Sequence, residues 1–261
     1  MIRVGVIGAR GRMGREVCRV VEAAEDLALV ATIDRSELAG GPEFEVSASL
    51  WELGDDDGRV HEGGMQVAVD FTRPEAVLPN ARWCLDHGVH VVVGTSGVTP
   101  ESLEEIRGLA EAGPANAIVV PNFAVGAVLM MRFAEEAARH FDAVEVIELH
   151  HGGKADAPSG TALATARRVG AARAGAWAAP AGDDAHPGAR GADVEGIRVH
   201  SVRLPGLLAH QEVVFGGPGE TLTIRHDSTD RSSFMAGVLL AIRSVGSRPG
   251  LTVGLEPLLE G

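Results

Sequence analysis

Short apolar runs alternate with helical patterns along the first 125 residues. The runs are rich in valine and isoleucine and are bounded by glycine or acidic residues; they cover residues 2–7, 27–33, 66–71, 89–93 and 117–120. Helical patterns lie between them at 11–24, 74–87 and 100–112. Near-continuous apolar strands that alternate with helices are typical of a parallel sheet covered by helices on both faces. The first part of the chain is therefore predicted to be a doubly wound α/β domain.

The pattern changes after residue 125. A helix is expected to follow residues 122–126 and to end near 141, with a strand at 144–149 and a second helix at 159–174. Residues 177–196 read as a loop. Three strand-like runs at 197–204, 207–215 and 220–226 suggest an antiparallel meander. A helix at 232–245 is expected to pack back on the first domain. These patterns predict two domains, 1–125 and 126–231, with 232–261 returning to the first, and the second as an α+β domain with a mostly antiparallel sheet.

Charge and hydropathy exclude several kinds of partner. The net charge of -13 argues against nucleic acid and against an anionic membrane surface. No apolar run reaches the roughly 18 to 20 residues that span a bilayer, and the first residues form a strand pattern without the layout of a signal peptide. Cys18 and Cys84 lie in helical patterns without a close-spaced partner. We therefore expect a reduced, cytoplasmic protein with neither a nucleic-acid nor a membrane partner.

A glycine-rich turn joins the first strand to the first helix. The turn carries Gly8, Ala9, Arg10, Gly11, Arg12, Met13 and Gly14. Its glycines permit a tight turn and the close approach of a pyrophosphate to the start of the helix. Asp34 ends the second strand, where an acidic residue can hold the hydroxyls of an adenine ribose. Together these features predict a Rossmann-type dinucleotide-binding domain; the alternative is a glycine turn that binds no ligand.

Arginines near this turn bear on the choice of cofactor. An acidic residue such as Asp34 favours NADH, whereas Arg10, Arg12 and Arg35 offer positive charge to the extra phosphate of NADPH. Both signals are present, so we expect both cofactors to bind. The alternative is that the three arginines are solvated surface charges.

Two further segments follow strands of the predicted parallel sheet. Gly94, Thr95 and Ser96 come after the fourth strand, and Val120, Pro121, Asn122 and Phe123 come after or end the fifth. Ligands of such sheets bind beyond the carboxyl ends of the strands. The backbone here is therefore expected to contact the nicotinamide, although a plain structural turn explains the spacing nearly as well.

Lysine occurs once in the chain. Of 23 basic residues only Lys154 is a lysine, and a lysine can release a proton where an arginine cannot. His150 and His151 lie just before it, and histidine titrates near neutral pH. Ser159, Gly160 and Thr161 follow at an expected helix start, where free N–H groups favour an anion. The alternative for Lys154 is a solvated surface charge.

The run from Glu148 to Thr161, Glu-Leu-His-His-Gly-Gly-Lys-Ala-Asp-Ala-Pro-Ser-Gly-Thr, resembles the motif of the dihydrodipicolinate reductases, the 4-hydroxy-tetrahydrodipicolinate reductases of bacterial and plant lysine biosynthesis. The glycine turn, the segments 94–97 and 121–126, and the runs 219–228 and 231–234 are also similar to that family, in the same order along nearly the whole chain. The resemblance implies hydride transfer from NADH or NADPH to 4-hydroxy-tetrahydrodipicolinate, which yields tetrahydrodipicolinate.

The resemblance also implies roles for particular residues. His150 would be the general acid, and Lys154 a second proton donor that contacts a substrate carboxylate. His151, Ser159, Gly160 and Thr161 would bind the carboxylates of a small cyclic dicarboxylic acid. The second domain would also build a homotetramer.

The spacing of the histidines along the sequence does not suggest a metal site.

The chain departs from the family pattern at a few positions. Gly152 and Gly153 stand where many members carry a further basic residue, so substrate affinity is expected to be lower. Ser96 stands where threonine is usual. Two other functions remain open: a different two-domain NAD(P)-dependent dehydrogenase of amino or sugar acids, and a non-catalytic dinucleotide sensor.

Overall fold

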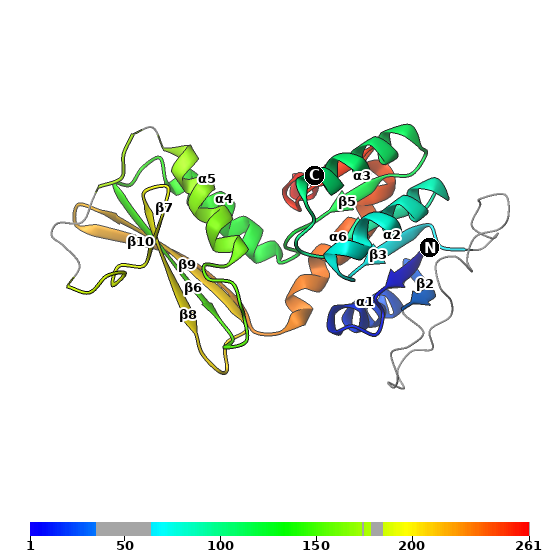
Figure 1. Ribbon diagram of the computed structural model, residues 1–261, viewed down its shortest axis with the longest axis horizontal. Helices are drawn as coiled ribbons and strands as arrows, with labels where there is room; N and C mark the ends of the chain where they lie inside the picture. The colour runs from blue at the N-terminus through cyan, green and yellow to red at the C-terminus, as the bar shows by residue number, and fades with distance from the viewer. Residues whose placement is uncertain (35–63, 174, 179–184, 261) are drawn as a thin grey trace. The chain divides into compact units, whose positions relative to one another are not determined.

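The computed structural model describes residues 1–34, 64–173, 175–178 and 185–260. They form two compact units: Met1–Phe123 together with Phe234–Gly261, and Ala124–Ser233 (Figure 1). Each unit has its own sheet. Arg35 falls outside the described residues.

The first unit contains a six-stranded sheet in the order β11-β5-β4-β3-β1-β2. Every neighbouring pair is parallel. The strands are β1 (Ile2–Ile7), β2 (Leu27–Ile33), β3 (Val67–Asp70), β4 (His90–Val93), β5 (Ala117–Val119) and β11 (Leu251–Val253). The predicted parallel α/β sheet is confirmed. β11, which adds an edge strand beside β5, was not anticipated.

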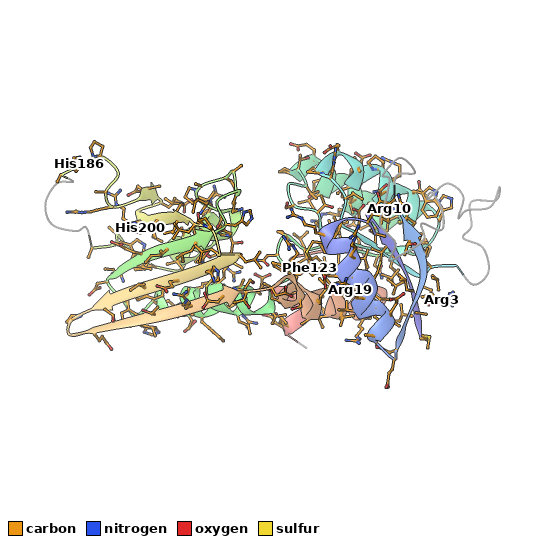
Figure 2. The ribbon with its side chains drawn as sticks, turned by 90° about the horizontal axis from the view of Figure 1, so that it is seen from below. Arg3, Arg10, Arg19, Phe123, His186 and His200 are labelled. Carbon is orange, nitrogen blue, oxygen red and sulfur yellow. The ribbon has the colours of Figure 1, made fainter. Side chains whose placement is uncertain are left out.

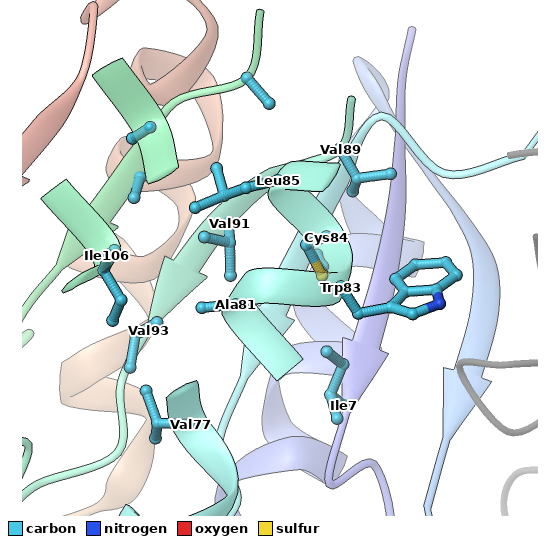
Figure 3. Packing of buried hydrophobic residues seen from close by; sticks show 14 of the residues in the cluster. Ile7, Val77, Ala81, Trp83, Cys84, Leu85, Val89, Val91, Val93 and Ile106 are labelled. Carbon is cyan, nitrogen blue, oxygen red and sulfur yellow. The ribbon is translucent and has the colours of Figure 1, made fainter. Parts of the chain in front are cut away.

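Helices cover both faces of this sheet, which explains why its strands are apolar at nearly every position. α2 (Pro74–Asp86) and α3 (Pro100–Ala112) pack side by side over one face, where Val77, Ile106, Val91 and Val93 share a core cluster (Figure 3). α1 (Arg12–Ala23) packs beside α6 (Met235–Ser244). Short elements complete the unit: η3 (Val245–Ser247) and α7 (Glu256–Leu259).

The second unit contains a five-stranded mixed sheet in the order β10-β9-β6-β8-β7. Its strands are β6 (Ala143–His150), β7 (Ala192–Val194), β8 (Ile197–Arg203), β9 (Ala209–Gly217) and β10 (Glu220–Ser228). The sheet is mostly antiparallel, as predicted; only β6 and β8 run parallel.

Two details of the predicted second sheet are wrong. β8 and β9 do not pair as a meander, because β6 lies between them and pairs with both. Buried and less buried residues alternate along β6, which is the pattern of a strand with one face against helices. In the middle of the sheet both edges of β6 are hydrogen-bonded to neighbouring strands. The predicted loop 177–196 also contains a strand, β7, at its end.

Helices α4 (Val125–Ala137) and α5 (Gly160–Ala172) contact each other and cover one face of this second sheet (Figure 1). Val146, Val213 and Phe215 point to that face and are fully buried. Because side chains alternate along a strand, Ile147 and Val214 lie on the opposite face, where they are only partly buried. The 3-10 helix η2 (Arg231–Phe234) follows β10.

Candidate active site

His150 is the last residue of β6, and its ring contacts a buried carboxylate on the same strand. Glu148 lies two residues earlier and therefore on the same face. Its side chain is fully buried, and its Oε2 lies 2.5 Å from Nδ1 of His150. The two side chains form a carboxylate–imidazole pair at the edge of the helix-covered face.

Arg203 neutralises Glu148 from the adjacent strand. The parallel register of β6 and β8 sets His150 opposite Arg203. Nη2 of Arg203 donates to Oε1 of Glu148 at 2.7 Å, and Nη1 donates to Oε2 at 2.8 Å. The backbone N–H of Ser159 donates to Oε1 at 3.2 Å. Burial alone would raise the pKa of Glu148, but the hydrogen bonds from Arg203, Ser201 and His150 together bring that pKa below its ordinary value.

His150 is less basic than a free histidine. Burial lowers its pKa, and the hydrogen bond and negative charge of Glu148 only partly oppose that effect. The positive charges of Lys154 and Arg203 lower the pKa further. A substrate that brings negative charge next to the ring would act in the opposite direction.

Lys154 lies in the loop that follows β6. The loop turns at once, because the N–H of Lys154 donates to the carbonyl of His151 at 3.1 Å. The ammonium Nζ lies 2.8 Å from Oδ1 of Asp156, and the lysine side chain is 24% exposed. The hydrogen bond from Lys154 lowers the pKa of Asp156. Nη2 of Arg203 also donates to the backbone carbonyl of Asp156, at 2.6 Å, and so ties the loop to β8.

The loop leads into the start of α5. Ser159 is the N-cap, and its Oγ accepts the N–H of Ala162 at 3.1 Å. Because Ser159 is buried, its hydroxyl serves the helix, whereas Gly160 is exposed and Thr161 partly so. The first backbone N–H groups of a helix have no partner within the helix and can therefore bind an anion. The structure thus brings His150, Lys154 and the start of α5 together around Glu148 and Arg203, with His151 exposed beside them.

Glu148 and Arg203 are the two residues of this cluster to which sequence reasoning gave no role. Glu148 carried a usable signal, since it has the same parity in β6 as the inward-facing Val144 and Val146. A charged residue at such a position needs a buried partner. Arg203, 55 residues away, carried no local signal.

The structure shows no common reason for glycine at positions 152 and 153. A Cβ at Gly152 would meet no heavy atom within 4 Å, and one at Gly153 would come 3.4 Å from the His151 ring. Space around Gly152 therefore does not explain the absence of a larger side chain there.

The glycine turn of the first unit has the geometry of an anion site. Gly8 adopts a φ of +82°, and a Cβ on Gly14 would lie 2.1 Å from the carbonyl of Gly8, so the turn packs directly on α1. Gly11 is the N-cap of α1 and, as a glycine, has no side chain with which to cap that helix. Oδ2 of Asp34 accepts the backbone N–H of Arg10 at 2.8 Å, which joins the end of β2 to the turn. Arg10 lies close to the start of α1 (Figure 2).

The segments after β4 and β5 carry both buried and exposed side chains. Gly94 is packed so tightly that a Cβ would lie 2.2 Å from the ring of Phe71. Thr95 donates to the fully buried Asp70 at 3.3 Å. Val120 and Phe123 are also buried, and Ser96 and Pro121 are exposed. Because the side chains of Thr95, Val120 and Phe123 are buried, the backbone is the part of these residues that a ligand can reach.

The described residues contain neither a metal-binding cluster nor a membrane-spanning helix. No group of three or more His, Cys, Asp or Glu side chains in them is arranged to hold a metal ion. None of their helices has both the length and the apolar composition needed to cross a membrane.

Comparisons with known proteins agree along the whole chain. The family models described as dihydrodipicolinate reductase, N-terminus, and dihydrodipicolinate reductase, C-terminus, match residues 2–123 and 126–259. A 4-hydroxy-tetrahydrodipicolinate reductase of Nocardia farcinica is 54% identical, with 99% of each chain covered.

Solved structures give the same result. A dipicolinate-bound dihydrodipicolinate reductase from Paenisporosarcina sp. TG-14 is 42% identical, has a TM-score of 0.85, and is covered over 99% of its length by 98% of this chain. The amine dehydrogenase of Mycobacterium smegmatis is 16% identical with a TM-score of 0.62, over 96% of this chain and 94% of that one. That second likeness shows a shared fold alone. The chain belongs to the dihydrodipicolinate reductase family of NAD(P)H-dependent oxidoreductases.

Proposed function

We propose that this protein reduces 4-hydroxy-tetrahydrodipicolinate to tetrahydrodipicolinate with NADH or NADPH, in the diaminopimelate and lysine pathway. The observation that carries the proposal is that His150 and the start of α5 both contact the buried Glu148, while Lys154 pairs with Asp156, whose carbonyl accepts from Arg203. Candidate proton donors and candidate anion-binding groups therefore belong to one part of the second unit. A small cyclic dicarboxylic acid needs both.

The carboxylates of the substrate would be held by a cation and by backbone donors. Lys154 is partly exposed and already pairs with a carboxylate, that of Asp156, so a substrate carboxylate can share or replace that contact. Gly160 and Thr161 offer the N–H groups of the α5 start, where the helix dipole favours negative charge. His151 and the backbone of Ser159 would complete the set.

His150 would deliver a proton as the hydroxyl group leaves as water and the ring is reduced. A histidine near neutral pH is suited to that step, and the negative charge of a bound dicarboxylate raises the pKa of a neighbouring imidazole. Lys154 would act as the second proton donor. These roles rest on the family resemblance and on the local geometry together.

The turn from Gly8 to Gly14, with Asp34 at its side, fits a dinucleotide. The tight glycine packing and the glycine N-cap of α1 are suited to the close approach of a pyrophosphate. When bound, the nicotinamide cofactor supplies the hydride. Asp34 would hold the adenine ribose, and Arg10 and Arg12, with Arg35 outside the described residues, would contact the phosphate of NADPH. Backbone of residues 94–96 and 120–123 would contact the nicotinamide.

We further propose a homotetramer assembled through the second unit. The face of its sheet opposite α4 and α5 carries apolar residues that are only partly buried in one chain, among them Ile147, Leu149, Val202 and Val214.

A cytoplasmic location is also proposed. It is supported by the two cysteines, which are free and buried; burial raises the pKa of Cys18 to about 12.

The substrate assignment is tested by a coupled assay. Aspartate semialdehyde, pyruvate and the synthase that joins them generate the substrate, and the loss of NADPH absorbance is followed on addition of this protein. We expect oxidation that depends on all three components. Intact NADPH binding without turnover would favour a dinucleotide sensor, and oxidation that requires a 2-oxo acid and ammonia instead would favour an amino-acid dehydrogenase.

A further inference from the structure

We propose that Glu148 is a positioning residue for the reaction: it holds the His150 ring with a proton on Nδ1, so that Nε2 is the nitrogen that gives its proton to the substrate. The inference rests on the proposed role of His150 as general acid and adds the group that orients it. Neither Glu148 nor Arg203 needs to touch the substrate for this role.

Besides the hydroxyl of Ser201, the two oxygens of Glu148 have different partners. Oε1 accepts from Nη2 of Arg203 and from the N–H of Ser159, at 2.7 and 3.2 Å. Oε2 accepts from Nη1 of Arg203 at 2.8 Å and lies 2.5 Å from Nδ1 of His150. A carboxylate with no proton can only accept, so the nitrogen facing it must be the donor. The proton between Glu148 and His150 therefore belongs to Nδ1.

The consequence for His150 is a fixed tautomer. In the imidazolium form both nitrogens carry protons, and release from Nε2 leaves the neutral ring with its proton on Nδ1, still bonded to Glu148. Release from Nδ1 would instead break the bond to the buried carboxylate. The pair thus directs proton transfer through Nε2 and stabilises the charged ring that must form before transfer.

Arg203 sets the strength of this effect. Among the described residues, the charged groups that act on His150 are Glu148 on its own strand, Lys154 in the following loop and Arg203 on β8. Because Arg203 shares both oxygens of Glu148, the carboxylate does not give its full charge to the imidazole. The ring is oriented firmly and remains able to release its proton.

Glu148→Gln changes the hydrogen bonding to His150 while it largely keeps the packing of the side chain at position 148. The amide has nearly the same shape, but its NH₂ must replace one oxygen. At the Oε1 position the NH₂ would face two donors, Arg203 and Ser159. At the Oε2 position it would face one donor and Nδ1, which can accept. The second arrangement costs less, and it moves the proton of neutral His150 from Nδ1 to Nε2.

The tautomer is read directly by long-range ¹H–¹⁵N spectra of protein labelled with ¹⁵N-histidine, with the His150 signals assigned by their loss in His150→Gln. We expect Nδ1–H in the neutral ring of the wild type and Nε2–H in Glu148→Gln. With substrate, kcat of Glu148→Gln should fall by roughly 10²-fold or more, the scale of general acid catalysis, while KM changes less. The alkaline limb of its kcat profile should move to lower pH, because the buried imidazolium has lost its carboxylate.

A matched control lies on the same strand. Glu145 pairs with Nε2 of His200 at 2.8 Å, on the opposite face of the sheet. Glu145→Gln makes the same chemical change in a histidine–glutamate pair, and it should leave kcat and the His150 tautomer as in the wild type. The mass in solution of both variants is measured alongside, so that a change in assembly is not mistaken for a change at His150.

The outcomes are decisive in each direction. Nε2–H on His150 of the wild type would overturn the inference, and so would a Glu148→Gln variant that keeps the wild-type tautomer and pH profile while losing only stability. If Glu148→Gln does not fold, Glu148→Asp keeps the charge beside Arg203 but withdraws it from Nδ1; wild-type kcat and pH profile in that variant would also overturn it. The tautomer is measured without substrate, so it stands even if the assay shows the proposed substrate to be wrong.

Discussion

Arg203→Met should destabilise the protein strongly, because it leaves a buried carboxylate without its counter-ion. Methionine keeps much of the length and apolar volume of the side chain but removes the two hydrogen bonds to Glu148 and the one to Asp156. Breaking a buried ion pair by removing one partner costs about 3–5 kcal/mol. The Arg203 side chain is 19% exposed, so water can reach part of the vacated space, and we expect a loss near the lower end, about 3 kcal/mol.

That loss translates into a clear shift in Tm. When the whole chain unfolds in one transition, 1 kcal/mol corresponds to about 2–4 °C, so the midpoint of thermal unfolding should fall by about 6–12 °C at neutral pH. Circular dichroism follows the transition. Arg168→Met is the control: Arg168 donates to Glu135 from α5 to α4 at 2.8 and 3.0 Å, but both side chains are about one-third exposed. Exposed pairs contribute roughly 0–1 kcal/mol.

The destabilisation of Arg203→Met should depend on pH in a definite direction. In the wild type the pKa of Glu148 lies below its ordinary value, so its stabilising contribution is present above the unfolded pKa and is lost as pH falls through the folded pKa. Without Arg203, burial dominates and raises that pKa. The penalty is then present at neutral pH and is relieved as pH falls through the raised pKa, so the Tm difference from wild type should shrink on acidification.

Two results would refute this reasoning. One is an Arg203→Met variant no less stable at neutral pH than Arg168→Met. The other is a Tm deficit that grows as the pH is lowered, because a buried and uncompensated carboxylate must become less costly when it is protonated.

Three further predictions concern activity. Lys154→Arg keeps the positive charge but loses the releasable proton, so most turnover should disappear in the coupled assay; normal turnover would exclude Lys154 as a proton donor. The Arg10→Ala, Arg12→Ala double variant should weaken NADPH binding about tenfold or more relative to NADH, a difference of about 1.4 kcal/mol or more, and equal losses in a binding titration would exclude phosphate contacts. The alkaline limb of kcat should lie at higher pH than that of kcat/KM, since burial lowers the His150 pKa in the free enzyme and a bound dicarboxylate raises it; coincident limbs would contradict this.

The sequence predicted the first sheet well because burial on both faces leaves a strong local pattern. Five of its strands are near-continuous apolar runs, and each follows or precedes a helix of ordinary length. β11 escaped prediction because it has only three residues, Leu251–Val253, and is recognisable only by its place beside β5. Alternation in β6, β8 and β9 gave the strands and their faces, but it carries no information about partners, which is why the predicted meander was wrong.

The candidate site divides in the same way. His150, Lys154 and Ser159 lie within ten residues of one another, so one short motif could identify them together. Arg203 joins them only because β8 pairs with β6 in parallel register, a contact that spans 55 residues. Cofactor preference stayed open because an acidic residue at position 34 is expected to favour NADH and an arginine at position 10 NADPH, and Arg35 lies outside the described residues.

The position of Glu148 shows why a charged residue at an inward-facing strand position can indicate function. A buried carboxylate is costly, and replacing such an ion pair by apolar residues of similar volume is often neutral or stabilising. Stability alone therefore gives little reason for Glu148 and Arg203 to occupy the interior of this sheet. An orienting role does give one, since a carboxylate can only accept and therefore keeps the proton of His150 on Nδ1, and a fixed partner such as Arg203 keeps that buried acceptor charged. On this argument the ion pair is retained for the chemistry of His150, and the stability that its disruption costs is a consequence.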